Sequence, residues 1–387
     1  MEFSTELKPL VKILSICSSI ADKKHTMPIL SNVKLVAEKG DSGGTLKIYS
    51  TDLEISLYGE MAASVTSPGD VAVSAKILFE IIRELSAETA EFKLVDNSRL
   101  EVSCDKSNYN IVAAGAFEFP SLTGVSISKP VLVNSEKLYE MFSKTMFAIT
   151  PDESRYNING LYVESIENAF GVGNSGIRFV STDGHRIAII DRPADGLLLD
   201  RGILIPRKGV AELMRLLNLG LIIEGETQVE IVREYFTVKS GPVILGIRLS
   251  DGVFPNYRQI LPKSKTTTVV VSREKFSMAV KRAAIVTTEI AKSIIFNVKN
   301  GVLELEAFSS ERGEAREELA VSQTGENVFT SFSSKYLLDL MSVFSDSEDL
   351  VITLDGAEGP GSFYFKPDDH YSCIMMPMRI SELKRAA

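Results

Sequence analysis

The chain has 387 residues, with 42 Lys and Arg against 51 Asp and Glu, and a formal net charge of −9. This length corresponds to roughly two to four domains, and 44% hydrophobic with 24% charged residues excludes a largely disordered chain. No run of about 18 apolar residues and no secretory signal pattern is present. The 3 Cys and 3 His are scattered, so we expect a cytoplasmic protein without a disulfide framework, metal site or cofactor.

Three segments with helical spacing open three similar stretches of the chain, at residues 4–14, 134–142 and 272–280. Each begins at or just after a Ser or Asn that predicts an N-cap, and each carries a Glu suited to the positive end of the helix dipole. The predicted caps and glutamates are Ser4 with Glu6, Asn134 with Glu136, and Ser272 with Glu274.

Alternating apolar residues predict strands after each of these helices. The strands are expected at 46–51 and 53–58, at 160–163 and 177–183, and at 294–298 and 302–307. A second helix follows in each stretch, at 75–83, 207–215 and 334–341. Lys76, Lys208 and Lys335 recur on these second helices at intervals of 132 and 127 residues.

This repeated order predicts three domains of one α+β fold, each with two helices packed on one face of antiparallel sheets. The first two stretches end alike, at Phe119-Pro120 and Phe254-Pro255. We therefore expect domains at 1–128, 129–262 and 263–387, the last with a short tail at 381–387.

The net charge argues against a nucleic-acid partner, but the charge is unevenly distributed. Windows 5–24, 207–216 and 272–282 carry +2, +2 and +3, and the corresponding windows on the other three helices are neutral. If the helices share one surface, that surface favours phosphates while the rest of the chain repels them. The alternative is that these basic side chains are simply solvated.

Most catalytic patterns fail on their context. Residues 171–176 match G-x-G-x-x-G but lead into a strand, which predicts a hairpin loop rather than a dinucleotide site. The segment Thr182–Ile187 is the densest polar cluster. It is open to an acid/base interpretation with Asp183 and His185, but Asp-Gly favours a tight turn. Thr51-Asp52 stands at the equivalent place in the first stretch, which favours a repeated structural corner.

The segment Ile374–Ile380, with three methionines and a proline, permits two interpretations. Methionine-rich apolar surfaces suit adaptable peptide binding. The alternative is a last core strand, which Pro377 would make irregular.

Taken together, several strings resemble the bacterial β sliding clamps, the beta subunits of DNA polymerase III. They are TDGHRI at 182–187, IPRKGV at 205–210, FPNYRQIL at 254–261 and MPMRI at 376–380, in the setting of three α+β repeats. The resemblance spans essentially the whole chain. It implies a head-to-tail homodimeric ring with helices lining the hole, which encircles double-stranded DNA without reading its sequence.

The resemblance also implies partners and an absence of catalysis. The clamp tethers the replicative polymerase alpha subunit, a clamp loader opens it, and other polymerases and repair proteins bind through short linear motifs. The family's peptide pocket maps onto Ile158, Thr182, Gly184, His185, Arg186, Ile187, Pro255, Ile260, Tyr336, Met376, Pro377, Met378 and Arg379.

Two further sets of positions follow from the resemblance. DNA contacts map onto Lys24, His25, Lys76, Arg155, Tyr156, Arg207 and Lys208. The dimer seam maps onto Tyr109 and Ile111 against Ile285 and Val286, with an acidic rim at Glu314, Glu317 and Glu318.

The chain departs from the family pattern at Asn157, Gln259 and Ser333, and it continues beyond the usual end as the tail 381–387. Two other functions stay open on the sequence alone. One is a hydrolase that uses Asp183 and His185, and the other is a scaffold that binds peptides but no DNA.

Overall fold

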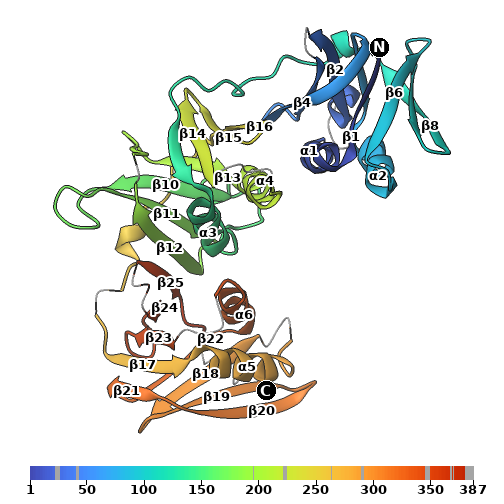
Figure 1. Cartoon of the computed structure of the whole chain (residues 1–387). Helices are drawn as coiled ribbons and strands as arrows, with labels where there is room; N and C mark the ends of the chain where they lie inside the picture. The colour runs from blue at the N-terminus through green and yellow to red at the C-terminus, as the bar shows by residue number, and fades with distance from the viewer. Residues whose placement is uncertain are drawn as a thin grey trace. The chain divides into compact units, whose positions relative to one another are not determined.

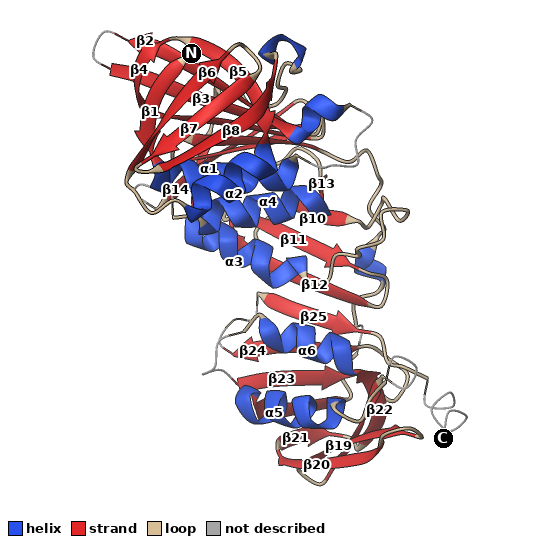
Figure 2. Ribbon diagram, turned by 90° about the vertical axis from the view of Figure 1, so that its right-hand side faces the viewer, coloured by secondary structure: helices blue, strands red, loops and turns tan. Residues whose placement is uncertain are grey.

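The computed structural model describes residues 1–21, 27–40, 43–194, 196–220, 225–262, 264–288, 292–344, 349–366, 368 and 370–379. Within these ranges the chain forms six α-helices and three sheets whose strands pair antiparallel (Figures 1 and 2). The predicted sites Lys24 and His25, and the tail 381–387, lie outside the described residues.

The six helices occur where the sequence pattern predicts them. They are α1 (Leu7–Ile20), α2 (Ala75–Glu84), α3 (Ser135–Met146), α4 (Arg207–Asn218), α5 (Arg273–Ala284) and α6 (Ser334–Ser342). Two of the predicted N-caps are confirmed. Asn134 Oδ1 accepts a hydrogen bond from the Lys137 amide at 2.9 Å, and Ser272 Oγ accepts one from the Lys275 amide at 3.5 Å.

The predicted start of the first helix is wrong. Residues Glu2–Glu6 form strand β1, so Ser4 is not an N-cap and Glu6 precedes the first turn of α1. β1 pairs with two strands, and the Phe3 ring stacks on that of Phe92 at 4.7 Å. Burial of alternate side chains in a paired strand outweighs a local preference for helix here.

The chain divides into two compact units. The first comprises Met1–Glu140, Asp195–Leu197 and Ile205–Ser250, and the second comprises Met141–Ala194, Leu198–Leu204 and Asp251–Ala387. Helices α1, α2 and α4 belong to the first unit, and α5 and α6 belong to the second.

The sheet of the first unit has twelve strands in the order β1-β6-β7-β8-β5-β2-β3-β4-β16-β15-β14-β9. Their bounds after β1 are β2 Asn32–Gly40, β3 Gly43–Thr51, β4 Ile55–Ser67, β5 Gly69–Ser74, β6 Thr89–Val95, β7 Arg99–Cys104, β8 Ser107–Ala114, β9 Val131–Asn134, β14 Glu226–Val232, β15 Tyr235–Ser240 and β16 Val243–Arg248. β4 and β16 join the first and middle stretches of the chain in one continuous sheet.

A second sheet has nine strands in the order β13-β10-β11-β12-β25-β24-β23-β17-β21. The bounds are β10 Gly160–Ile166, β11 Gly176–Thr182, β12 Arg186–Pro193, β13 Ile203–Pro206, β17 Thr267–Ser272, β21 Ser322–Gly325, β23 Asp349–Leu354, β24 Gly361–Lys366 and β25 Tyr371–Met375. Here β12 and β25 join the middle and last stretches of the chain, as β4 and β16 do for the first and middle stretches.

The remaining four strands form the sheet β20-β19-β18-β22. They are β18 Ser293–Lys299, β19 Val302–Ser309, β20 Gly313–Ala320 and β22 Val328–Ser333. The predicted hairpin loop is confirmed, because residues 171–175 lie in the connection 167–175 between β10 and β11, which contains no helix. In the described part of the chain, none of the helices combines the length and the apolar character that a membrane crossing requires.

Candidate peptide-binding pocket

Two tight turns of the same construction end β3 and β11. In the first, Thr51 Oγ1 accepts from the Leu53 amide and donates to the Ile55 carbonyl. In the second, Thr182 Oγ1 accepts from the Gly184 amide at 3.0 Å and donates to the Arg186 carbonyl at 2.7 Å. The predicted repeated corner is therefore confirmed, and Asp52 and Asp183 stand at equivalent places.

The aspartate of the second turn is fully used by the turn itself. Asp183 Oδ1 accepts from the amides of His185 and Arg186, at 3.0 and 3.1 Å, and Asp183 Oδ2 accepts from Arg186 Nε at 3.1 Å. The sequence predicts a strand as far as residue 183, but β11 ends at Thr182, because Asp183 already belongs to the turn. These bonds make Asp183 a turn carboxylate that caps backbone amides, which is not the geometry of a base held against a histidine ring.

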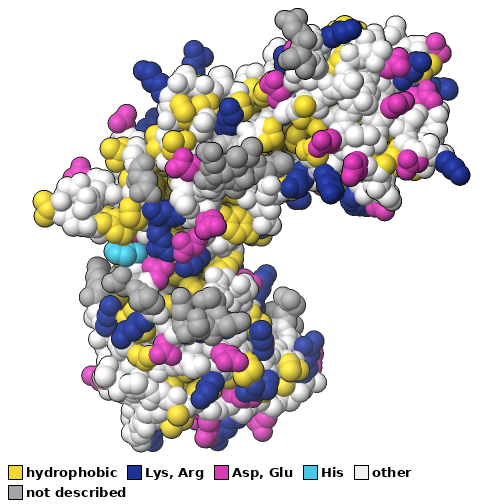
Figure 3. All heavy atoms as spheres, in the orientation of Figure 1, with side chains coloured by type: hydrophobic (Ala, Val, Ile, Leu, Met, Phe, Trp, Pro, Cys, Tyr) yellow, Lys and Arg dark blue, Asp and Glu magenta, His cyan; other side chains and the backbone are white. Residues whose placement is uncertain are grey.

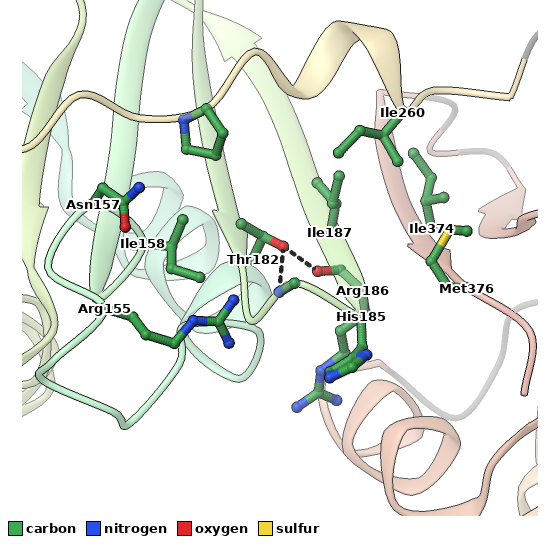
Figure 4. A pocket seen from close by; sticks show the side chains of 12 residues that line it. Arg155, Asn157, Ile158, Thr182, His185, Arg186, Ile187, Ile260, Ile374 and Met376 are labelled. Carbon is green, nitrogen blue, oxygen red and sulfur yellow. Dashed lines mark hydrogen bonds between the residues drawn. The ribbon is translucent and has the colours of Figure 1, made fainter.

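A cavity of about 340 Å³ opens beside this turn. Figure 4 shows Ile187, Ile260, Ile374 and Met376 converging on it from three segments of the second unit. Its full lining is Arg155, Asn157, Ile158, Thr182, Gly184, His185, Arg186, Ile187, Pro255, Ile260, Ile374 and Met376. A concave site with apolar walls and a few polar groups at its rim suits the anchor side chains of a short peptide.

Two of the lining residues, Ile187 and Ile374, belong to a buried cluster with Val180, Ile189 and Tyr257. Tyr257 lies in the short helix η3 (Tyr257–Gln259), and its hydroxyl donates to Glu164 Oε1 and accepts from Arg178 Nη1. Burial raises the pKa of Tyr257 to about 12. The phenol therefore stays protonated and fastens the segment that carries Pro255 and Ile260.

Arg186 forms one wall of the cavity and is 5% exposed. Its Nη2 atom donates to the Phe147 carbonyl at 2.7 Å and to Asp339 Oδ2 on α6 at 2.8 Å. Its guanidinium also lies over the Phe147 and Tyr336 rings, at 4.9 and 4.3 Å from their centroids. The second turn, the end of α3 and α6 are thus held by one buried cation.

The terminal methionine segment combines the two alternatives left open by its sequence. Ile374 and Met375 are buried strand residues, whereas Met376 is 41% exposed and lines the cavity. β25 ends at Met375, and the Met376 amide donates to the His185 carbonyl at 2.9 Å. The segment is thus a core strand up to Met375, and Ile374 within it and Met376 directly after it line the cavity.

Four of the predicted pocket positions are not part of the lining: Tyr336, Pro377, Met378 and Arg379. Tyr336 stands behind the wall, with its ring centroid 6.2 Å from that of His185. Met378 is turned to β22, where its amide donates to Ser331 O at 2.9 Å.

Three lining residues were missed: Arg155, Asn157 and Ile374. Arg155 was assigned to DNA, but its Nη1 donates to the Asp183 carbonyl at 2.8 Å, and Figure 4 shows its side chain directed to the turn. Their closeness in sequence to Ile158 and Met376 was the available signal.

The other predicted DNA-contact positions differ in their surroundings. Tyr156 is 68% exposed. Lys76 Nζ lies 3.7 Å from Glu80 Oε1 on the surface of α2, and Lys208 Nζ lies 2.5 Å from the buried Asp52 Oδ2. Arg207 is partly buried at the start of α4. On the face shown in Figure 3, Lys and Arg side chains are interspersed with Asp and Glu.

The predicted seam positions lie on edge strands and beside helix α5. Tyr109 is 37% exposed on β8, whereas Ile111 is only 4% exposed and points into its own domain. Ile285 is 70% exposed after α5. Of the acidic rim, Glu314 and Glu318 are exposed, whereas Glu317 is half-buried and binds Arg282 of the same chain.

No group of three or more His, Cys, Asp or Glu side chains suited to a metal ion occurs in the described ranges.

Comparison with known proteins identifies the family. Three family models match in chain order: the N-terminal, central and C-terminal domains of the DNA polymerase III beta subunit, over residues 1–123, 132–256 and 258–379. The beta sliding clamps of Caulobacter vibrioides and Pseudomonas aeruginosa are each 30% identical to this chain, covering 98% of it and 100% of their own length.

Solved structures agree. Caulobacter crescentus pol III beta superimposes with a TM-score of 0.87 at 29% identity, covering 98% of this chain and 100% of the other. A Bartonella birtlesii sliding clamp bound to griselimycin gives 0.88 at 26% identity, with 98% and 99% coverage. The three-domain repeat thus has the beta clamp fold, and the hydrolase interpretation is wrong. The chain belongs to the DNA polymerase III beta subunit family, the beta sliding clamps, which are non-catalytic processivity factors that encircle DNA.

Proposed function

We propose that two copies of this chain close head to tail into a ring around duplex DNA in the cytoplasm, and that the pocket beside the second turn tethers the replicative polymerase. The domains would be 1–128, 129–262 and 263–387. The observation that carries the tethering role is the cavity bounded by Ile187, Ile260, Ile374 and Met376, because its apolar walls fit the anchors of a short linear motif.

The same pocket would serve the polymerase alpha subunit, the clamp loader, and other polymerases and repair proteins in turn. Arg155 and His185 stand at its rim beside the Gly184 turn. A cationic rim favours peptides that carry an acidic residue next to their apolar anchors. Asn157 and Gln259, where the chain departs from its family, lie in or next to this site and would adjust the preference among partners.

Ring closure is supported by two strands with free edges. β20 is the terminal strand of its sheet, and along Ser107–Val112 β8 pairs only with β7 among the described strands. Val112 is 78% exposed there, and Ile285 is 70% exposed on the last domain. An edge strand with exposed apolar side chains is a template for pairing with a second chain, and two different edges make a heterologous contact that closes a ring.

DNA would be held by helix-borne cations such as Lys76 and Arg207, with the exposed Tyr156 next to Arg155 in the sequence. Contacts of this kind neutralise phosphates without reading bases, which a sliding protein requires.

Retention on DNA tests the clamp function. After loading onto a nicked circular plasmid, the protein should co-elute with the DNA, and cutting the plasmid once should release it. A scaffold that binds peptides alone would not be retained, and a protein held by contacts rather than by topology would stay on the cut DNA.

A further inference from the structure

Lys208, at the second position of α4, binds a deeply buried carboxylate of the first family domain. Its Nζ lies 2.5 Å from Asp52 Oδ2, and Asp52 is 2% exposed. The other oxygen, Asp52 Oδ1, accepts from the amides of Glu54 and Ile55, at 3.0 and 2.7 Å. Both residues belong to the same compact unit. A carboxylate at this depth requires a counter-charge, because removing one member of a buried pair leaves the other uncompensated.

A second buried acid lies on the same helix and is paired with Arg215, whose Nε lies 3.3 Å from Glu212 Oε2. Glu212, one turn further along α4, is 3% exposed and accepts a hydrogen bond from Ser19 Oγ of α1 at 2.5 Å. Burial raises the pKa of Glu212, while Ser19, Arg215 and Lys208 act in the opposite direction. Each of the two buried acids at the contact between the Thr51–Ile55 turn, α1 and α4 thus has a cation from α4, Lys208 for Asp52 and Arg215 for Glu212.

The equivalent lysines of the other two domains have different surroundings. Lys76 on α2 lies 3.7 Å from Glu80, and both side chains are about half exposed. Lys335 on α6 is exposed, and Asp339, four residues on, is bound by Arg186 instead. In the described part of the chain, Lys208 alone of the three is paired with a buried acid.

We propose that Lys208 is a positioning residue that fixes α4 against the Thr51–Ile55 turn, rather than a phosphate contact. The Lys208 side chain is 40% exposed, so a phosphate would compete with Asp52 for the ammonium group, and the buried carboxylate would lose part of its counter-charge. The inference depends on the proposed function only in one respect: the phosphate contact that it denies to Lys208 is part of the proposed DNA binding. The contact between the first domain and α4 is held by this pair whether or not DNA is bound.

The test compares matched glutamine variants at the equivalent helix positions, Lys208→Gln, Lys335→Gln and Lys76→Gln, in the full-length protein. The melting temperature of Lys208→Gln should fall by at least about 5 °C, because the buried Asp52 carboxylate loses its counter-charge. The other two variants should stay within about 1 °C, since their lysines are exposed. Asp52→Asn combined with Lys208→Gln should recover more than half of the loss, and Lys208→Arg nearly all of it.

Hydrogen exchange locates the effect. In Lys208→Gln the amides of Glu54 and Ile55 should exchange faster, while those of His185 and Arg186 in the equivalent turn should not change. The single variant Asp52→Asn removes the carboxylate that pairs with Lys208. If Lys208 is a positioning residue, the DNA affinity of this variant should be unchanged. If Lys208 is a phosphate contact, the variant should bind DNA more tightly.

The proposal is overturned if Lys208→Gln and Lys335→Gln have the same melting temperature and the same amide hydrogen exchange, and each variant also loses about one phosphate contact. That loss is measured as a smaller salt dependence of DNA binding. Tighter DNA binding by Asp52→Asn would also overturn it. Melting and exchange need no DNA, so a failure of retention on circular DNA would remove the proposed ring function and leave this inference standing.

Discussion

The two places where neighbouring domains join are built alike but have different consequences. At the first junction the Arg248 amide donates to the Glu54 carbonyl at 2.8 Å, and at the second the Met376 amide donates to the His185 carbonyl at 2.9 Å. The same strand pairing and the same Thr-Asp turn occur at both. The fold alone therefore does not make a peptide pocket.

The difference lies in a few side chains at the mouth of each turn. Gly184 leaves the second turn open beside the cavity, whereas Leu53, 47% exposed, occupies the equivalent position of the first. Met376 is an apolar wall, and its equivalent Arg248 is an exposed cation. The junctions also differ in the cation that satisfies the turn aspartate: Arg186 from the strand at the second, and Lys208 from the helix at the first. One scaffold thus yields a binding site or a structural joint according to these positions.

The largest expected effect is on stability at the second junction. Arg186→Met removes the cation shared by Asp183 and Asp339 and should cost about 3–5 kcal/mol in the free energy of unfolding. The matched control is Ile55→Met, the equivalent position of the first junction, which exchanges one buried apolar side chain for another and should cost less than about 1.5 kcal/mol. Urea unfolding checks both, and equal losses would contradict the role given to Arg186.

Next comes the loss of the pocket itself. Gly184 has φ +91°, and a Cβ there would lie 2.6 Å from Arg155 Nη2. Gly184→Leu, which copies the first junction, should weaken binding of a polymerase-derived peptide by at least about 30-fold. Calorimetric titration measures the change. The reverse variant, Leu53→Gly, should bind the peptide as the unchanged protein does, and a loss of affinity in it would place part of the site at the first junction.

A smaller loss of peptide affinity is expected from a change at Met376, which lines the cavity. Met376→Arg copies Arg248 and puts a charge against an apolar anchor, so peptide affinity should fall by about tenfold, or about 1.4 kcal/mol. Fluorescence polarisation with a labelled peptide is sufficient to detect it. Arg248→Met serves as the control and should leave the peptide affinity unaltered. An equal loss of affinity in both variants would contradict the role of Met376 as a wall of the pocket.

The smallest expected effect concerns the pH dependence of the first junction. Burial raises the pKa of Glu212 above its ordinary value, so its charged form destabilises the fold. This penalty is absent below the ordinary glutamate pKa and is complete above the raised one. Glu212→Gln should therefore gain stability relative to the unchanged protein as the pH rises through that window. Melting curves from pH 4 to 8 check the trend, and an advantage that grows on acidification would contradict it.

Much of the fold could be predicted, because the three repeats place similar caps, helices and turns at equivalent positions of the sequence. Helices α3 and α5 begin where Asn134 and Ser272 predict their caps, and the Thr-Asp turns lie where equivalent positions predict them. The helix predicted over 4–14 is wrong at residues 4–6, because strand β1 pairs on both sides with distant partners that a local pattern does not contain.

The site was less accessible to sequence reasoning than the fold. The pocket strings TDGHRI and MPMRI were recognised by resemblance, but the direction of each side chain depends on packing between distant segments. The Arg155 guanidinium donates to the Asp183 carbonyl and the Lys208 ammonium lies beside Asp52, contacts that the sequence pattern does not predict. Tyr336 supports Arg186 from behind the wall. The direction of these side chains is set by burial and charge pairing between distant segments, which the sequence of one segment does not show.

The third domain repeats the turn with one omission. Ser309 Oγ accepts from the Glu311 amide at 3.3 Å, as the threonines do in the other two turns, but Ser310 stands where Asp52 and Asp183 stand. In the proposed ring this third corner would face the next subunit, where Lys76 would hold the position of Lys208. Without a carboxylate at 310, that joint would form without the ion pair that Asp52 and Lys208 make within the chain. The proposed ring would then be weakest at its seam, where a loader would part it to admit DNA.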